Sequence, residues 1–118
     1  MAVDELRIEK ETLTGKGIPV LILYGAINVS TFEKLEAAIQ ELFAAKIFTV
    51  FIDVANVKYV SSAGAGVLMN AYLQAQEQKG NLVLIRLSPG VRDVLDLLNL
   101  HNVIPIAEDA RAALELLK

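Results

Sequence analysis

The chain has 118 residues and a formal net charge of −3, with apolar residues at 54% and charged residues at 21%. This length predicts a single domain over residues 1–118 with a substantial core. The absence of cysteine excludes disulfides, thiolate metal sites and cysteine nucleophiles. No apolar run reaches the ~18 residues of a membrane-spanning helix, and the first residues show no secretory signal, so we expect no membrane insertion and a cytoplasmic location. The acidic balance, without a Lys/Arg cluster, disfavours a nucleic-acid partner.

Two strands and a helix are predicted in the first part of the chain. A loosely alternating segment begins at Leu6 and ends at the turn Thr14-Gly15-Lys16-Gly17. The apolar run Pro19–Tyr24 follows, and together these segments are typical of an antiparallel hairpin. Ser30 and Glu33 fit a capping box with Ser30 as the N-cap, and apolar residues at helical spacing then continue to about Ala45.

The rest of the chain alternates between strand and helix signals. Phe48–Asp53 is rich in β-favouring residues and predicts a buried strand, with a loop over residues 54–60. Serine and proline at 88 and 89 are typical of a helix start. The other predicted elements are a helix from Ala63 to Gln78 closed by Lys79-Gly80, a strand over Leu82–Leu87, an edge strand over Val103–Ile106 and a terminal helix over Asp109–Lys118. This order predicts an α/β fold, a mixed central sheet with about four helices packed on it.

The stretch Lys58–Val67, KYVSSAGAGV, places two serines and two glycines at the start of a predicted helix. A serine hydrolase would need a G-x-S-x-G elbow and a histidine base. The first glycine is missing around Ser62, and the only histidine is His101. Phosphate-binding glycine loops are absent, and neither His101 nor Asp53 has the neighbours of a metal site. We therefore predict no enzyme activity, no catalytic residue, no cofactor and no metal.

Two readings of the serines remain open at this point. Either Ser61 or Ser62 could cap the helix, a role that stabilises by about 1 kcal/mol. Gly64 and Gly66 each lower helix propensity by ~1 kcal/mol relative to alanine, which a cap alone does not require. Glycines there would leave the backbone donors of the helix N-terminus open to an anion. The stretch would therefore tolerate a phosphate on Ser62.

The segment from Val50 to Ile106 resembles the STAS domain, and specifically the bacterial anti-sigma factor antagonists. The matching features are the strand ending in Asp53, the serine-glycine turn with Gly64, the helix closed by Lys79-Gly80 and "LSP" leading into "VRDVLDLLNL". Upstream, "VLILYGAINVSTFEKLEAAI" is similar to the family's second strand and first helix. The resemblance implies a non-enzymatic protein that binds an anti-sigma factor serine kinase when unphosphorylated. Serine phosphorylation would release it, and a serine phosphatase would reset it.

The resemblance also implies site residues. With the family's turn aligned on Gly64, the phosphate acceptor falls on Ser62, with Ser61 as the second choice. Two acids common near the family's acceptor are replaced here by Asn28 and Ser61. The residues expected to bind the partner are Asn28, Ser30, Thr31, Tyr59, Ser61, Ser62, Ala65 and Met69.

The replaced acids leave an alternative open. In that alternative the chain is a constitutive STAS subunit of a scaffold or lipid-transport complex, without phosphoswitching. The sequence leaves open which kinase and pathway are involved, and whether the chain dimerises.

Overall fold

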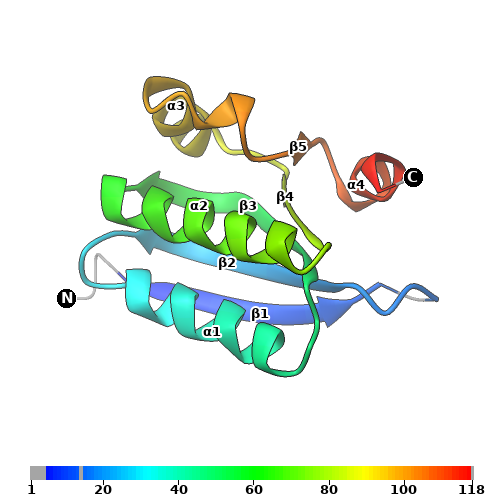
Figure 1. Cartoon of the computed structure of the whole chain (residues 1–118). Coiled ribbons are helices and arrows are strands. Elements are labelled where there is room, and N and C mark those ends of the chain that lie inside the picture. Colours follow the sequence, from blue (N-terminus) through cyan, green and yellow to red (C-terminus); the bar gives the residue numbers. More distant parts are fainter. Residues whose placement is uncertain (1–4, 14, 118) are drawn as a thin grey trace.

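The computed structural model describes residues 5–13 and 15–117. Strands and helices follow one another in the predicted order (Figure 1). The elements are β1 (Leu6–Thr12), β2 (Pro19–Ile27), α1 (Phe32–Ala44), β3 (Thr49–Val60), α2 (Ser62–Glu77), β4 (Asn81–Ile85), α3 (Pro89–Leu97), the short 3-10 helix η1 (Leu100–Asn102), β5 (Ile106–Ala107) and α4 (Ala110–Leu116). Thr14 of the predicted turn and Lys118 of the predicted terminal helix lie outside the described residues.

The strands form one mixed sheet in the order β1-β2-β3-β4-β5. β1 pairs with β2 in antiparallel fashion, and each later strand is parallel to its neighbour. The parallel pairs are joined through helices, as parallel connections require. The predicted fold class is therefore confirmed, since the sheet is mixed and the described residues form four α-helices around it.

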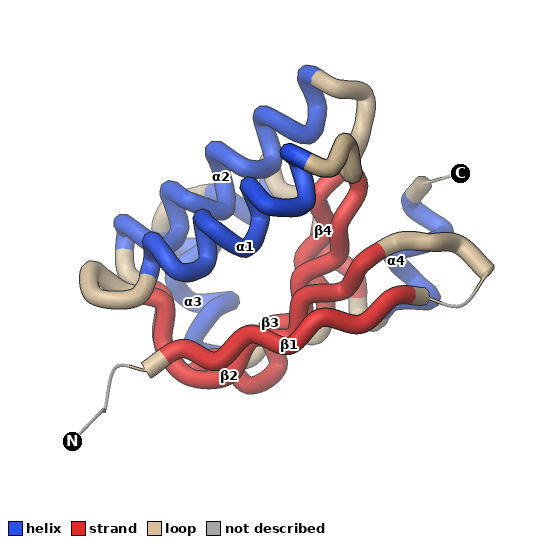
Figure 2. The backbone as a smooth tube through the Cα atoms, turned by 90° about the horizontal axis from the view of Figure 1, so that it is seen from below, coloured by secondary structure: helices blue, strands red, loops and turns tan. Residues whose placement is uncertain are grey.

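Helices cover the two faces of the sheet unequally. The larger core joins residues of α1, α2 and α3, such as Leu35, Leu68 and Leu95, to one face of the sheet. On the other face a smaller cluster joins Phe51 of β3 to Ala113 of α4. In Figure 2, α1 and α2 lie side by side, while α4 lies away from them beyond β4. The carboxyl ends of β2 and β3 are therefore beyond the cover of α4.

β3 is twice as long as its predicted range, because residues 54–60 continue the strand instead of forming a loop. The pairing with β2 shifts twice, between Ile22 and Tyr24 and again between Gly25 and Ala26. These bulges place the valines at 54, 57 and 60 on the same buried side, three residues apart. A strand without bulges buries every second residue, so this segment does not show the alternation expected of a strand.

Asp53 stabilises the first bulge. The whole residue is 8% exposed, and its Oδ1 accepts a hydrogen bond of 3.0 Å from the backbone N–H of Ala55. Its Oδ2 lies 3.6 Å from Nε of Arg86. Arg86 has a positive φ of 58° and turns the chain out of β4, which ends at Ile85 instead of the predicted Leu87.

The predicted helix start at Ser88 is confirmed. The Ser88 hydroxyl accepts a hydrogen bond of 3.3 Å from the N–H of Val91 and donates one of 2.6 Å to the carbonyl of Val57. The same side chain thus caps α3 and ties it to the extended part of β3. The predicted edge strand is shifted, since residues 100–102 form η1 and only Ile106 and Ala107 pair with β4.

The capping box predicted for α1 is wrong. Thr31, not Ser30, is the residue before the first helical turn, and it makes no side-chain cap hydrogen bond. The backbone N–H of Ser30 instead donates to Oδ1 of Asn28 at 2.9 Å. The Thr31 hydroxyl bonds within the loop, to the N–H of Asn28 and the carbonyl of Ala26, so it does not cap the helix.

Candidate functional site

The candidate site lies where β2 and β3 end next to each other. Ile27 and Val60 are the last paired residues of these parallel strands. The N–H of Ser61 donates a hydrogen bond of 2.8 Å to the carbonyl of Ile27. This bond places the start of α2 against the loop that joins β2 to α1, and it brings together the two segments in which the sequence predicts site residues.

Ser61 is the serine that caps α2. Its backbone is extended, and its hydroxyl accepts a hydrogen bond of 3.1 Å from the N–H of Gly64. Its carbonyl accepts another from the N–H of Ala65 at 2.9 Å. Ser61 is only partly exposed. The capping role that the sequence left open between the two serines therefore belongs to Ser61.

Ser62 is the first helical residue of α2, and it is exposed. Its side chain makes no hydrogen bond with the part of the chain that the structure describes, so the hydroxyl has no capping function to lose. The position also lies at the positive end of the helix dipole, where a negative group is favoured. An added group on this oxygen would project into solvent without displacing a neighbour in the core.

Gly64 and Gly66 have different roles. A Cβ at Gly64 would lie 2.6 Å from Cγ2 and 3.0 Å from the carbonyl oxygen of Ile27, so Gly64 allows α2 to approach β2. A Cβ at Gly66 would have nothing within 4 Å. The expectation that both glycines leave the helix N-terminus bare is wrong for Gly64, which is buried against the strand. Close packing explains Gly64, and we have no structural reason for a glycine at 66.

The loop between β2 and α1 is held by Asn28 and Thr31. Asn28 Oδ1 accepts a hydrogen bond of 2.9 Å from the N–H of Ser30, and it lies 3.3 Å from the Thr31 hydroxyl oxygen. The Thr31 hydroxyl donates a hydrogen bond of 2.7 Å to the carbonyl of Ala26 and accepts one of 2.9 Å from the N–H of Asn28. Only the acceptor oxygen of the Asn28 side chain takes part in the loop, so a carboxylate could make the same bonds.

The predicted partner-binding residues fall into three groups by exposure. Ser30, Ser62 and Tyr59 are exposed, with Tyr59 at 53%, while Asn28, Ser61 and Met69 are partly exposed. Ala65 is only 1% exposed and Thr31 only 8%. Ala65 packs in the core and Thr31 shapes the loop from within, so neither can form part of a contact surface in this conformation.

Sequence reasoning missed Val29, which is 72% exposed in the same loop. With Tyr59 it gives the surface beside Ser62 two large apolar side chains. An apolar residue between the polar residues Asn28 and Ser30, directly after a buried strand, was the available signal. Contiguous exposed apolar surface can mark a protein interface, so Val29 and Tyr59 are candidates for contact with a partner.

His101 lies on a different element from the two serines. His101 lies in η1, where its Nδ1 is 3.4 Å from Oδ1 of Asp96. Among residues 5–13 and 15–117, no group of three or more histidine, aspartate or glutamate side chains could hold a metal ion. No helix within these ranges is sufficiently long and apolar to span a membrane.

Comparison with known proteins shows that this chain is similar to STAS domain proteins. A family model described as "Mlab, STAS domain" matches residues 13–106. BtrV of Bordetella bronchiseptica, named as a candidate anti-sigma factor antagonist, is 31% identical over 97 residues, which are 82% of this chain and 84% of BtrV.

Solved structures show the same fold. The crystal structure of an anti-sigma factor antagonist from Mycobacterium paratuberculosis superimposes with a TM-score of 0.84 at 24% identity, covering 97% of this chain and 95% of that one. The phosphorylated form of the Bacillus cell fate determinant SpoIIAA superimposes with a TM-score of 0.69 at 18% identity. The superposition covers 95% of this chain and 100% of that one.

Proposed function

Because the chain belongs to the STAS domain family and to its anti-sigma factor antagonists, we propose that it is a binding module gated by phosphorylation of Ser62. In its unphosphorylated form it binds an anti-sigma factor that is also a serine kinase. Phosphorylation by that kinase releases it, and a serine phosphatase restores binding. The protein acts by association and dissociation, as expected of a family of non-enzymatic regulators.

The observation that carries the proposal is the division of roles between the two serines. Ser61 is committed to the cap through Gly64, whereas the neighbouring hydroxyl of Ser62 is exposed and makes no hydrogen bond within the described ranges. A kinase can reach Ser62 without unfolding the helix. The existence of SpoIIAA structures in unphosphorylated and phosphorylated forms supports such a modification in a protein of this fold.

The docking surface in this proposal surrounds Ser62. It comprises the exposed or partly exposed residues Asn28, Val29, Ser30, Tyr59, Ser61, Ser62 and Met69. Phosphate on Ser62 adds about −1.5 to −2 charges, and burying that charge in an interface without a partner is unfavourable. A loss of ~2 to 3 kcal/mol in binding free energy corresponds to roughly 30- to 150-fold weaker affinity.

Phosphopeptide mass spectrometry tests the modification directly. Trypsin cleaves after Lys58 and Lys79, and the segment between them contains no other lysine or arginine. The resulting peptide carries both serines and no threonine, so fragmentation needs only to distinguish Ser61 from Ser62 and from two tyrosines. Protein isolated from its own cells under phosphatase inhibition is expected to carry phosphate on Ser62.

Binding measurements then test the gate. The partner is sought among the anti-sigma factor kinases of the same genome, and its affinity is measured for wild type, Ser62→Ala and Ser62→Asp. Wild type and Ser62→Ala should bind alike, while Ser62→Asp should bind more weakly. Asn70→Asp is the matched control, because it adds the same charge to an exposed position of α2.

Equal binding by wild type and Ser62→Asp, together with unphosphorylated Ser62 under growth, starvation and stress, would favour the second candidate function. This is a constitutive subunit of a scaffold or lipid-transport complex, in which the start of α2 is a fixed contact. The observation in its favour is the neutral Asn28, whose side chain serves the loop.

A further inference from the structure

The α4 helix leaves part of the sheet face opposite α1–α3 uncovered. The α4 helix packs on this face at Val20, Phe51 and Val83. Toward the carboxyl ends of β2 and β3 lies an open concavity of about 1530 Å³. Tyr24 of β2 and Asn56 of β3, which are register partners in the sheet, both contribute to its lining. Successive side chains of a strand point to opposite faces, so Tyr24 projects away from the core that contains Leu23.

The lining of the concavity carries mainly positive charge. Its charged residues are Arg7, Lys34 and Lys58 against one carboxylate, Glu5. The whole chain has a net charge of −3, so this surface reverses the sign of the protein as a whole. A concave surface with one sign of charge attracts ligands of the opposite sign and increases their association rate.

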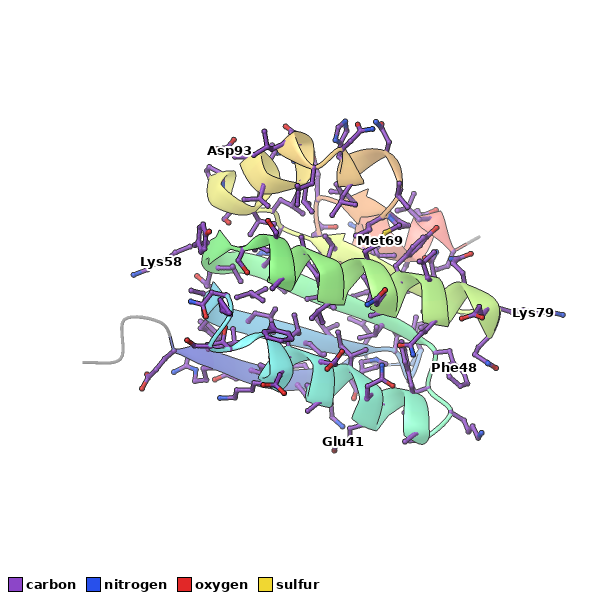
Figure 3. The ribbon with its side chains drawn as sticks, turned by 60° about the vertical axis from the view of Figure 1, so that its left-hand side comes forward. Glu41, Phe48, Lys58, Met69, Lys79 and Asp93 are labelled. Carbon is purple, nitrogen blue, oxygen red and sulfur yellow. The ribbon has the colours of Figure 1, made fainter. Side chains whose placement is uncertain are left out.

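The three cations are held to different degrees. The guanidinium of Arg7 lies 4.1 Å from the centre of the Tyr24 ring, and its Nε is 3.6 Å from Oε2 of Glu9. Lys34 donates from Nζ to the carbonyl of Leu6 at 2.5 Å. Lys58 makes no ion pair with any residue that the structure describes, and Figure 3 shows its side chain extending outward where α2 begins. Lys58 is therefore the cation most available to a ligand.

We propose that this concavity, bounded by Arg7, Lys34 and Lys58, binds an acidic segment of the protein that docks beside Ser62. The inference rests on the proposed function, because it assigns the chemistry of that partner. Ser30 and Tyr59 belong both to the lining of the concavity and to the docking surface. A partner seated at Ser62 would thus reach the concavity without a break in the contact.

A phosphate on Ser62 should weaken the binding of an acidic segment in the concavity. An acidic segment in the concavity would lie at the end of the sheet where Ser62 begins α2. Phosphate on Ser62 adds about −1.5 to −2 charges at that end and repels such a segment. Repulsion between exposed charges decreases as salt increases, with a screening length of about 8 Å at physiological ionic strength. The release of the partner on phosphorylation should therefore be less complete at high salt.

A short fluorescent oligoglutamate peptide is the probe, used with the full chain. Anisotropy at low salt measures its affinity, and amide chemical-shift changes locate its binding site. We expect shifts at Arg7, Tyr24, Asn56 and Lys58, and binding that weakens as salt increases. Lys58→Glu should lower the affinity at least about ten-fold, equivalent to ~1.4 kcal/mol.

Lys16→Glu is the matched control. Lys16 is also exposed but lies in the turn between β1 and β2, at the opposite end of β2 from the site. The variant makes the same change in net charge as Lys58→Glu. Because Lys16 does not line the concavity, the variant should still bind the peptide as wild type does. Equal losses in both variants would mean that the peptide senses only net charge, and this would overturn the proposal.

Three other results also contradict the proposal. They are absence of peptide binding, shifts that map elsewhere, and self-association of the chain through this face in sedimentation. The inference can fail while the proposed function stands. In that case Ser62→Asp would lose the kinase partner, whereas Lys58→Glu would bind it as tightly as wild type does. If Ser62→Asp has no effect, the proposed function itself fails.

Discussion

Replacement of Gly64 by alanine should destabilise the protein through close contacts with Ile27. The new methyl group would lie 2.6 Å from Cγ2 of Ile27, a residue that is 0% exposed and packs in the core. Overpacking of this kind costs about 1 to 3 kcal/mol. Alanine also improves helix propensity by ~1 kcal/mol relative to glycine, which opposes part of that cost. The net loss of stability should therefore be about 0 to 2 kcal/mol.

Gly66→Ala separates these two contributions. A methyl group at Gly66 meets nothing within 4 Å, so only the propensity term remains and the variant should be stabilised by up to ~1 kcal/mol. The difference between the two variants isolates the packing cost, about 1 to 3 kcal/mol. Urea unfolding followed by circular dichroism measures both free energies of unfolding. Equal stability of Gly64→Ala and Gly66→Ala would refute the close approach of α2 to β2.

Three further substitutions test the local geometry by the same unfolding assay. Ser61→Ala should lose about 1 kcal/mol because it removes the cap of α2, whereas Ser62→Ala should remain within ~0.5 kcal/mol of wild type; the reverse ranking would mean that Ser62 is the cap. Asn28→Asp should fold with nearly unchanged stability, because its carboxylate can accept the same hydrogen bond from the N–H of Ser30, while Asn28→Ala should lose ~1 to 2 kcal/mol; a large loss in the aspartate variant would contradict the acceptor-only role. Ser88→Ala should lose ~1 to 3 kcal/mol, since one hydroxyl both caps α3 and bonds to β3, and a neutral result would show that water replaces both bonds.

Local signals were sufficient for several elements. Serine followed by proline at 88 and 89 identified the start of α3, because capping and the fixed φ of proline act within one turn. The start of α2 was placed within one residue, because a capping serine also acts within one turn. The sequence also predicted a mixed sheet, since alternating strands and helices leave few ways to bury their apolar faces. The resemblance to STAS domains was confirmed by comparisons that cover most of the chain.

The tertiary structure decided what depended on contacts between distant segments. The extension of β3 to Val60 depends on two bulges in its pairing with β2, and these replace the two-residue alternation by a spacing of three. The requirement for glycine at 64 depends on Ile27, which is far away in sequence. Ala65, which the sequence placed on the contact surface, is buried because it packs in the core that α2 forms with the sheet.

The sequence by itself determined that two serines stand at the start of a helix, and that either could cap it. Which one does so depends on where the preceding strand ends, because the hydrogen bond from Ser61 to the carbonyl of Ile27 fixes the entry of the chain into α2. That bond directs the Ser61 hydroxyl to the N–H of Gly64 and leaves Ser62 on the outer surface. Residue types and spacing are local properties, whereas the direction of a side chain is set by the strand against which its backbone is paired.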